Sequence, residues 1–167
     1  MKIAIIGTGN LGQSIAKGLI TTNAITTLYL TKRNIESIQD FEGYKKVIIT
    51  SDNVKAVKHS DILIFAVQPA HFESILKDIS SFLTENHVII STVTGFTISR
   101  IEAVVGQEQF IIRAMPNTSL AVGTSMTRLC FYANVQNLIK ISSSIFNLLV
   151  TSIPRKLTRL HSSPVLI

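Results

Sequence analysis

The sequence predicts an α/β domain built on a doubly wound, mostly parallel β-sheet with helices on both faces, followed by a short helical or irregular C-terminal stub. Two observations lead to this prediction. Short runs rich in Ile, Leu and Val alternate with segments of helical spacing through the first two thirds of the 167 residues, which is typical of βαβ units. The predicted strands are apolar at nearly every position, as expected for strands covered on both faces.

Each predicted strand ends in a polar turn before helical spacing resumes. Strands are predicted at 2–6, 26–30, 46–50, 62–67, 88–91 and 110–114. Helices are predicted at 11–20, 35–41, 54–58, 72–83 and 98–104. Beyond Asn117 the pattern changes: 124–131 is a candidate strand, 135–149 has helical spacing, and 153–167 has no clear period. We therefore expect one α/β domain over 1–130 and a divergent helical or irregular tail over 131–167.

Composition and charge narrow the classes of function. With 46% hydrophobic and 16% charged residues, the chain can build a core and is not disordered. The net charge of +6 invites a nucleic-acid partner, but residues 1–108 contain ten acidic and ten basic residues, so the excess lies in the acid-free stretch 109–167. Six bases spread over those 59 residues argue against a nucleic-acid-binding module. No apolar run reaches the roughly 18 residues of a membrane span.

The cysteine and histidine residues form no evident reactive cluster. A single cysteine, Cys130, excludes an internal disulfide and fits a reducing compartment, so we expect a cytoplasmic protein in which Cys130 is a small buried hydrophobe. His59 and His87 flank predicted strands and are expected at the surface. His71 follows Pro69 at the start of a predicted helix, where it either caps the helix or faces solvent. We predict no metal site and assign no catalytic residue.

The most informative motif is Gly7-Thr8-Gly9-Asn10-Leu11-Gly12, a G-x-G-x-x-G sequence between a predicted strand and a predicted helix. In that context the first glycine allows a tight turn, the second lets the backbone approach a pyrophosphate, and the third lets helix and strand pack closely. The free N–H groups and the dipole of the helix N-terminus favour an anion. We therefore predict a Rossmann-type dinucleotide site over Ile6 to Gly12. The alternative is a glycine turn without a ligand.

The end of the second predicted strand indicates which dinucleotide is preferred. NAD sites usually place an Asp or Glu there, about 20 residues after the glycines, to bind the ribose 2′-OH. Here the sequence reads Leu30-Thr31-Lys32-Arg33-Asn34, with two cations and no acid. Since cations attract a 2′-phosphate, we predict NADP as the cofactor, with NADPH preferred over NADH and Arg33 as the favoured contact. The alternative is that Lys32 and Arg33 are ordinary solvated loop charges.

Three further strand ends are candidates for the same site, because ligands of open parallel sheets bind beyond the carboxyl ends of the strands. Ala66-Val67-Gln68-Pro69 either lines the path from the adenine ribose to the nicotinamide or only terminates the fourth strand. Thr92-Val93-Thr94-Gly95 follows the fifth strand in the same way. Met115-Pro116-Asn117 follows the sixth, where a proline-fixed polar turn would meet a substrate or the nicotinamide.

With these residues assembled, the chain resembles the pyrroline-5-carboxylate reductase family. The matching segments are Ile6 to Gly12, Lys58-His59-Ser60-Asp61 leading to Ala66-Val67-Gln68-Pro69, Ile112-Arg113-Ala114-Met115-Pro116-Asn117-Thr118, Val122-Gly123 and Met126-Thr127. The Arg-Ala-Met-Pro-Asn-Thr string is far more specific than the glycines. The resemblance runs from Met1 to about Cys130, and more faintly to about Ile153.

The resemblance implies a reaction and a set of contacts. The reaction is the reduction of the cyclic imine Δ1-pyrroline-5-carboxylate to proline by hydride transfer from NADPH or NADH. By resemblance, Ile6 to Leu11 contact the pyrophosphate and Asn53 contacts the adenosine part. Ala66 to Pro69 contact the nicotinamide ribose side, and Thr92 to Gly95 lie beside the nicotinamide.

The resemblance also implies a second part of the protein. Members of the family carry a second, helical domain, which builds the dimer and much of the substrate pocket. Its Ser-Gly-Ser-Gly-Pro-Ala-Tyr-like loop has no counterpart in residues 1–167. We therefore expect a truncated chain that is weakly active or inactive alone, with a small-molecule substrate and no nucleic-acid or membrane partner. The alternatives are a non-catalytic dinucleotide-binding remnant, or another small NADP-dependent Rossmann oxidoreductase such as a hydroxyacid or deazaflavin-linked reductase.

Overall fold

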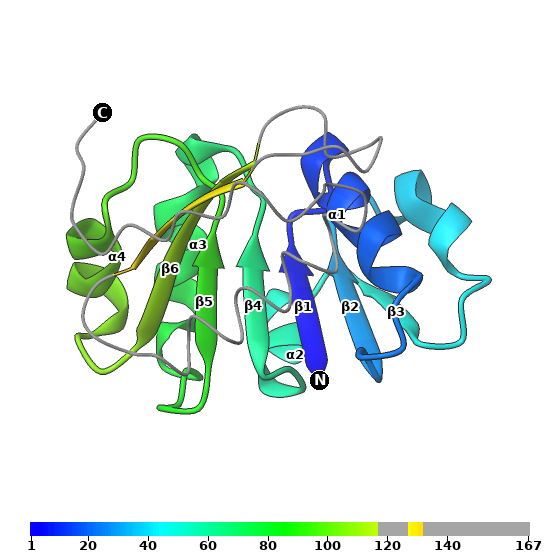
Figure 1. Ribbon diagram of the computed structural model, residues 1–167, viewed down its shortest axis with the longest axis horizontal. Helices are drawn as coiled ribbons and strands as arrows, with labels where there is room; N and C mark the ends of the chain where they lie inside the picture. The colour runs from blue at the N-terminus through cyan, green and yellow to red at the C-terminus, as the bar shows by residue number, and fades with distance from the viewer. Residues whose placement is uncertain (117–126, 132–167) are drawn as a thin grey trace, which may run out of the picture.

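A single twisted sheet organises the chain. The computed structural model describes residues 1–116 and 127–131. They form a seven-stranded sheet with the order β3-β2-β1-β4-β5-β6-β7 (Figure 1), in which β1 to β6 are parallel and β7 runs antiparallel to β6. The strands are β1 (Lys2–Ile6), β2 (Thr27–Thr31), β3 (Val47–Thr50), β4 (Ile62–Phe65), β5 (Val88–Ser91), β6 (Phe110–Pro116) and β7 (Thr127–Phe131). The predicted doubly wound α/β class is confirmed.

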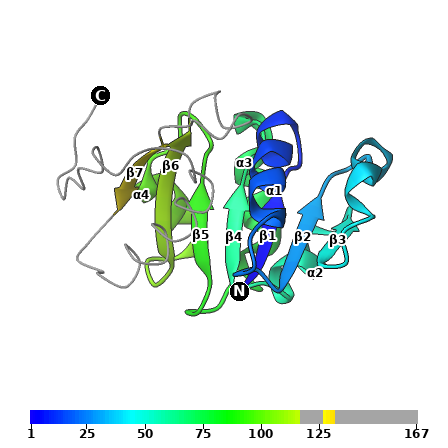
Figure 2. The same cartoon turned by 45° about the vertical axis from the view of Figure 1, so that its right-hand side comes forward.

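Helices cover both faces of the sheet (Figures 1 and 2). One face carries α1 (Asn10–Ile20) and the 3₁₀ helix η1 (Ile35–Phe41). The other carries α2 (Asn53–Lys58), α3 (Pro69–Ser80) and α4 (Ile98–Val105). This follows from the strand order: crossovers between parallel strands are right-handed, and the chain moves outward from β1 in one direction and from β4 in the other.

The strands contribute to two cores because successive side chains point to opposite faces. Ile3 and Ile5 of β1 pack on the α1 side, whereas Ala4 and Ile6 pack on the side of α2, α3 and α4. On that second side Phe72 of α3 makes edge-to-face contacts with two other rings. Its ring centroid is 5.4 Å from that of Phe65 and 4.9 Å from that of Phe96. Such pairs contribute about 0.5–1.5 kcal/mol each beyond area burial, and these join β4, α3 and the segment before α4.

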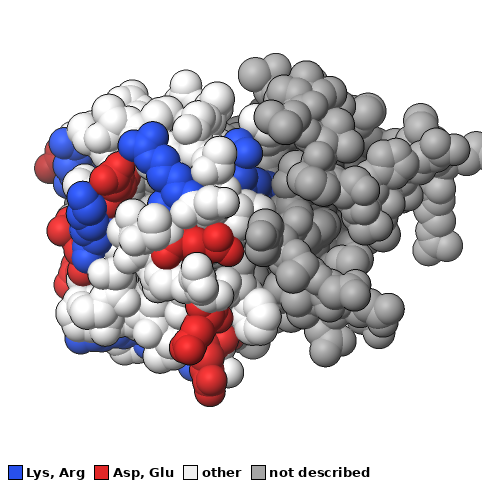
Figure 3. All heavy atoms as spheres, turned by 90° about the vertical axis from the view of Figure 1, so that its left-hand side faces the viewer, with Lys and Arg blue, Asp and Glu red and all other residues white. Residues whose placement is uncertain are grey.

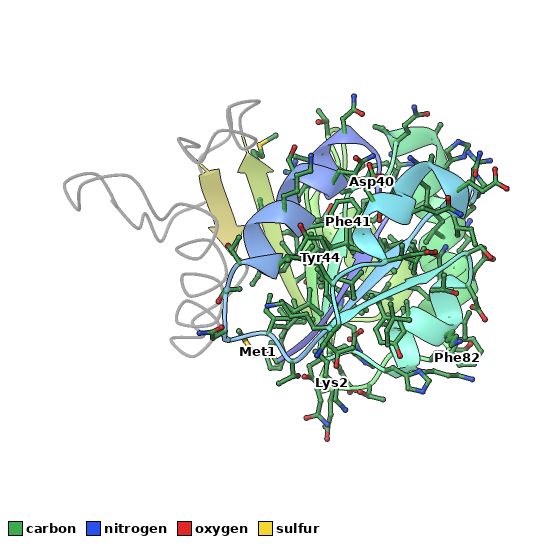
Figure 4. All side chains as sticks on the ribbon, turned by 90° about the vertical axis from the view of Figure 1, so that its right-hand side faces the viewer. Met1, Lys2, Asp40, Phe41, Tyr44 and Phe82 are labelled. Atoms are coloured by element: carbon green, nitrogen blue, oxygen red, sulfur yellow. The ribbon has the colours of Figure 1, made fainter. Side chains whose placement is uncertain are left out.

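The two edges of the sheet carry different parts of the chain. In the view from the β3 side of the sheet, Met1 and Lys2 lie at the end where β1 begins (the amino edge), whereas Asp40 of η1 lies at the opposite end (Figure 4). At the amino edge the Lys2 backbone N–H donates to an Asp61 carboxylate oxygen at 3.0 Å. The turns that follow the parallel strands leave from the opposite, carboxyl edge (Figure 1). The predicted cofactor residues after β1, β2, β4 and β5 therefore share that edge.

Several element boundaries differ from the predicted ones. Helix α3 begins at Pro69 rather than at residue 72, because proline is well suited to the first helical position, where its missing N–H has no partner in any case. Strand β4 ends at Phe65, two residues before the predicted end. Segment 35–41 is a 3₁₀ helix interrupted by a non-helical conformation at Ile38. Of the candidate strand at 124–131, the structure describes Thr127–Phe131, which is β7. The predicted helix at 135–149 and the rest of the tail after Phe131 lie outside the described residues.

His87 is buried, and its predicted surface position is wrong. Only 7% of the residue is exposed. Its Nδ1 accepts a hydrogen bond from the Thr84 backbone N–H at 2.9 Å, so its Nε2 carries the proton and donates to the Val57 carbonyl at 3.2 Å. His87 thereby joins the connection before β5 to α2. His59 is exposed, as predicted, and its ring stacks on Tyr29 with centroids 5.9 Å apart.

The described surface carries charges of both signs. Figure 3 shows Lys and Arg side chains interspersed with Asp and Glu on one face rather than gathered in a basic patch. Glu73 of α3 pairs with Lys77 at 3.0 Å and with Arg100 of α4 at 2.9 Å. Hydrogen bonds from Lys77 and from Arg100 lower the pKa of the Glu73 carboxyl. None of the described helices is both long and apolar enough to cross a membrane.

Candidate dinucleotide-binding site

The predicted cofactor residues meet where the strand order reverses, between β1 and β4. Ile6, the last residue of β1, is paired with Thr31 of β2 on one side and with Phe65 of β4 on the other. Phe65 is in turn paired with Ser91, the last residue of β5. Four strand ends and their turns therefore lie side by side at the carboxyl edge (Figure 1). In open α/β sheets, ligands bind outside the carboxyl ends of the strands at such a reversal.

Two glycines of the motif are required by packing within the protein. Gly7 has a φ of +91°, a conformation that other residues rarely adopt, and a Cβ on it would collide with the Val67 side chain. A Cβ on Gly12 would overlap the carbonyl oxygen of Gly7. Helix α1 thus packs directly on the turn, and these positions have the turn-forming and packing roles predicted from the sequence.

Gly9 is not required by packing. Its φ of −79° and ψ of −162° are open to any residue, and a Cβ built there would have no neighbouring atom within 4 Å. Gly9 is the N-cap of α1, it makes no side-chain cap, and the first turn of α1 contains no acidic residue. The N–H groups at this helix end are therefore available to an anion beside an open space.

Thr31 holds the glycine turn in place, and sequence reasoning did not include it in the site. Its carbonyl oxygen accepts from the backbone N–H of Thr8 at 2.8 Å and from the Thr8 hydroxyl at 3.1 Å. Its hydroxyl oxygen accepts from the Gly7 N–H at 3.2 Å. Both threonines are buried. The signal in the sequence was a threonine at the end of the second strand, directly before Lys32.

The basic pair at the end of β2 lies beside this turn. Lys32 is half-buried, and Arg33 is exposed. Within the part of the chain that the structure describes, neither of them forms an ion pair with an acidic side chain. Nη2 of Arg33 instead lies 3.4 Å from Nε2 of His71, an exposed residue in the first turn of α3. Lys32 and Arg33 therefore place positive charge at the carboxyl end of β2, next to the glycine turn.

The segment after β4 leads from the sheet into α3. The Ala66 backbone N–H donates to the Ile6 carbonyl at 2.9 Å, so Ala66 stays bound to β1. Val67 is half-buried against Gly7. Gln68 is the exposed N-cap of α3, and its side chain makes no capping hydrogen bond. Ala66 and Val67 therefore lie next to the glycine turn, and Gln68 and Pro69 continue from them into α3.

The segment after β5 is anchored to β4. Thr92 donates to the Phe65 carbonyl twice, from its backbone N–H at 3.0 Å and from its hydroxyl at 2.7 Å. Val93 is buried, whereas Thr94 and Gly95 are exposed, and Gly95 has a φ of +81°. The exposed half of this turn is available to a ligand at the same edge of the sheet.

The other predicted residues lie farther out along the sheet. Asn53 is the first residue of α2, three positions after the end of β3, and is half-buried. Met115 is 45% exposed near the end of β6, and Pro116 is the last residue of that strand. Asn117 lies outside the described residues. Among the described residues no group of three or more His, Cys, Asp or Glu side chains is placed to hold a metal ion.

Comparison with known proteins identifies the family to which this chain belongs. Residues 2–95, more than half of the chain, match the family model described as NADP oxidoreductase coenzyme F420-dependent. The chain belongs to this family. The matched part of this NADP oxidoreductase family member runs from β1 to the turn after β5, so it includes every predicted cofactor residue.

The curated proteins to which this chain is similar include pyrroline-5-carboxylate reductases. The chain is 41% identical to pyrroline-5-carboxylate reductase 2 of Dictyostelium discoideum over 129 residues, which is 75% of this chain and 43% of the relative. It is 36% identical to pyrroline-5-carboxylate reductase 1 of the same organism, over 90% of this chain and 30% of the relative. The family resemblance read from the sequence is therefore confirmed. The chain spans less than half the length of these two relatives.

A solved structure of a relative has the same fold. The pyrroline carboxylate reductase of Plasmodium falciparum, solved with NADP bound, superposes with a TM-score of 0.76 at 28% sequence identity. The match covers 89% of this chain and 55% of that chain. The Rossmann-type arrangement of this oxidoreductase family member is therefore also found in a relative solved with NADP.

Proposed function

We propose that this chain is the cofactor-binding part of a pyrroline-5-carboxylate reductase and that it binds NADP(H) at the carboxyl edge of β1 and β2. The observation that carries the proposal is the contrast between Gly9 and its neighbours. Gly7 and Gly12 are required by protein contacts, whereas the space beside Gly9 is open and lies at an uncapped helix N-terminus. A glycine that the fold does not need is explained by a ligand that approaches the backbone.

The surrounding residues fit a phosphorylated dinucleotide. The backbone from Ile6 to Gly12 would hold the pyrophosphate with N–H groups at the α1 N-terminus. Lys32 and Arg33 would hold the 2′-phosphate, because no carboxylate stands at the end of β2 to repel it. By family resemblance, Asn53 would contact the adenosine part.

The nicotinamide and the substrate would lie toward β5 and β6. Ala66 to Pro69 and the exposed half of Thr92 to Gly95 border the reversal point on that side. Met115, Pro116 and Asn117 would meet the substrate. When bound, the cofactor supplies the hydride for reduction of an imine carbon, and the residues of this chain would position the ring. No described residue is assigned a proton-transfer role.

We also propose that NADPH binds more tightly than NADH. A 2′-phosphate adds about −1.5 to −2 charges at neutral pH, which Lys32 and Arg33 attract without competition from a carboxylate at the strand end. Since both contacts are partly exposed to water, we expect about a tenfold difference, equal to about 1.4 kcal/mol. The name of the relative solved with NADP bound supports this cofactor.

A second candidate is a dinucleotide-binding protein with little or no reductase activity of its own. The observation behind it is that the two curated relatives are more than twice as long as the segment matched here. The helical domain that the family resemblance implies for the substrate pocket is not recognisable in residues 1–167. We therefore propose that these residues alone bind the cofactor but turn over little pyrroline-5-carboxylate.

The two candidates are separated by measuring binding and turnover on the same preparation. Titration of the 167-residue chain with NADPH, followed by nicotinamide fluorescence, should show saturable binding and a weaker signal for NADH. Proline formation from pyrroline-5-carboxylate should remain near background. Absence of nucleotide binding by a folded chain would contradict the cofactor proposal. Rescue of a proline-requiring bacterium by the 167-residue gene would contradict the proposal of low turnover.

A further inference from the structure

We infer that His71 is a positioning residue for the phosphate end of this site: its imidazole holds Arg33 in place and thereby increases the preference for NADPH over NADH. This inference rests on the proposed function. The observation is a contact between residues 38 positions apart, in which Nη2 of Arg33 lies 3.4 Å from Nε2 of His71. Arg33 follows β2, and His71 lies in the first turn of α3, so the contact crosses the reversal point of the sheet.

The chemistry of the two groups fixes the direction of the contact. A guanidinium only donates hydrogen bonds, so Nε2 of His71 must accept and the ring must carry its proton on Nδ1. The neutral imidazole is therefore the form that binds Arg33. It restrains one side of the guanidinium while other N–H groups of the fork stay free for a phosphate.

The restraint matters because Arg33 is exposed and has a long side chain. A free arginine loses much of its rotamer freedom when it binds a ligand, and this loss reduces the affinity. A partner that already confines the side chain removes part of that cost. Among the described residues no carboxylate pairs with Arg33 in its place, so the guanidinium is held without being neutralised.

If His71 positions Arg33, a substitution of His71 should affect the binding of the two nucleotides differently. Removing His71 should weaken NADPH binding but leave NADH binding unchanged, because NADH has no group for Arg33 to hold. The expected change in the ratio of the two affinities is about threefold, as for a single exposed polar contact. H71Q should restore most of the ratio, because its amide oxygen can accept from Arg33.

The experiment measures dissociation constants for NADPH and NADH with wild type, H71A, H71Q, R33A and R33A/H71A. The H59A variant, which removes another exposed histidine, is the control and should leave the ratio unchanged. If His71 acts through Arg33, H71A has no further effect in the R33A background. Melting temperatures without nucleotide should be equal for wild type, H71A and H71Q.

The remaining outcomes are also decisive. An equal loss for NADPH and NADH in H71A, or no loss for either, would overturn the role of His71 while the cofactor site stands. A full effect of H71A in the R33A background would show that His71 does not act through Arg33. Binding of neither nucleotide by folded wild type would overturn the proposed function and this inference with it.

Discussion

A Cβ on Gly12 of α1 would overlap the carbonyl oxygen of Gly7, so no side chain fits between the helix and the turn. The same Cβ would also lie 3.3 Å from the side chain of Ile5. Because the carbonyl is backbone and cannot swing away, any larger residue must push α1 off β1. The position of the helix N-terminus, and hence of the proposed pyrophosphate site, depends on this contact.

The first prediction concerns that contact. G12A should lower the free energy of unfolding by about 1–3 kcal/mol, the usual cost of overpacking, and should also weaken NADPH binding because α1 moves. Urea denaturation followed by far-ultraviolet circular dichroism measures the first effect. G43A is the matched control, since a Cβ at Gly43 has no neighbour within 4 Å. Equal stability of G12A and G43A would contradict the packing role of Gly12.

The second prediction concerns the anchor of the glycine turn. T31V removes the acceptor of the Gly7 N–H and should cost about 1–2 kcal/mol, because a partly buried donor loses its partner. T8V should cost less, since the Thr31 carbonyl keeps its bond from the Thr8 backbone. Denaturation of both variants gives the comparison. A larger loss in T8V than in T31V would show that the Gly7 bond is not the main anchor.

The sequence predicted the mostly parallel sheet and the packing roles of Gly7 and Gly12 because each depends on local patterns. Apolar runs mark the buried strands, and their alternation with helical segments indicates βαβ connections. The contact between Arg33 and His71 could not be predicted in this way, because it joins turns 38 residues apart. The prediction for His87 was wrong for a similar reason, because its buried ring bonds to the Val57 carbonyl, which comes from α2 and lies 30 residues earlier in the sequence.

The third prediction concerns the cations at the end of β2. R33A should remove most of the expected preference of about tenfold for NADPH and leave NADH binding nearly unchanged, since only NADPH carries the 2′-phosphate. Parallel fluorescence titrations with the two nucleotides measure the ratio. K17A, in the last turn of α1, removes one positive charge away from the site and controls for net charge. An unchanged ratio in R33A would mean that Arg33 is a solvated loop charge, the alternative that the sequence left open.

The fourth prediction concerns Glu73, whose pKa is lowered from its ordinary value of 4.5 by hydrogen bonds from Lys77 and Arg100. A carboxyl with a lowered pKa in the folded state stabilises the fold above its unfolded pKa, and that contribution is lost as the pH falls through the folded value. E73Q should therefore be less stable than wild type at pH 7, and the difference should shrink below pH 4.5.

Urea midpoints of wild type and E73Q across pH 3 to 7 measure this difference. The expected effect is small, because the pair is exposed to water. E85Q is the control, as Glu85 is exposed and forms no ion pair with a described residue. A gap between wild type and E73Q that widens as the solution is acidified would have the wrong sign and would contradict the role of Lys77 and Arg100.

The most direct test of the account is the affinity of G9A for NADPH. The backbone at Gly9 accepts any residue and a Cβ there contacts no protein atom, so G9A should fold with the melting temperature of wild type. If the open space belongs to the cofactor pyrophosphate, the added methyl group should weaken NADPH binding at least about tenfold, the effect of losing about 1.4 kcal/mol. Wild-type affinity in a folded G9A chain would contradict the proposed dinucleotide site.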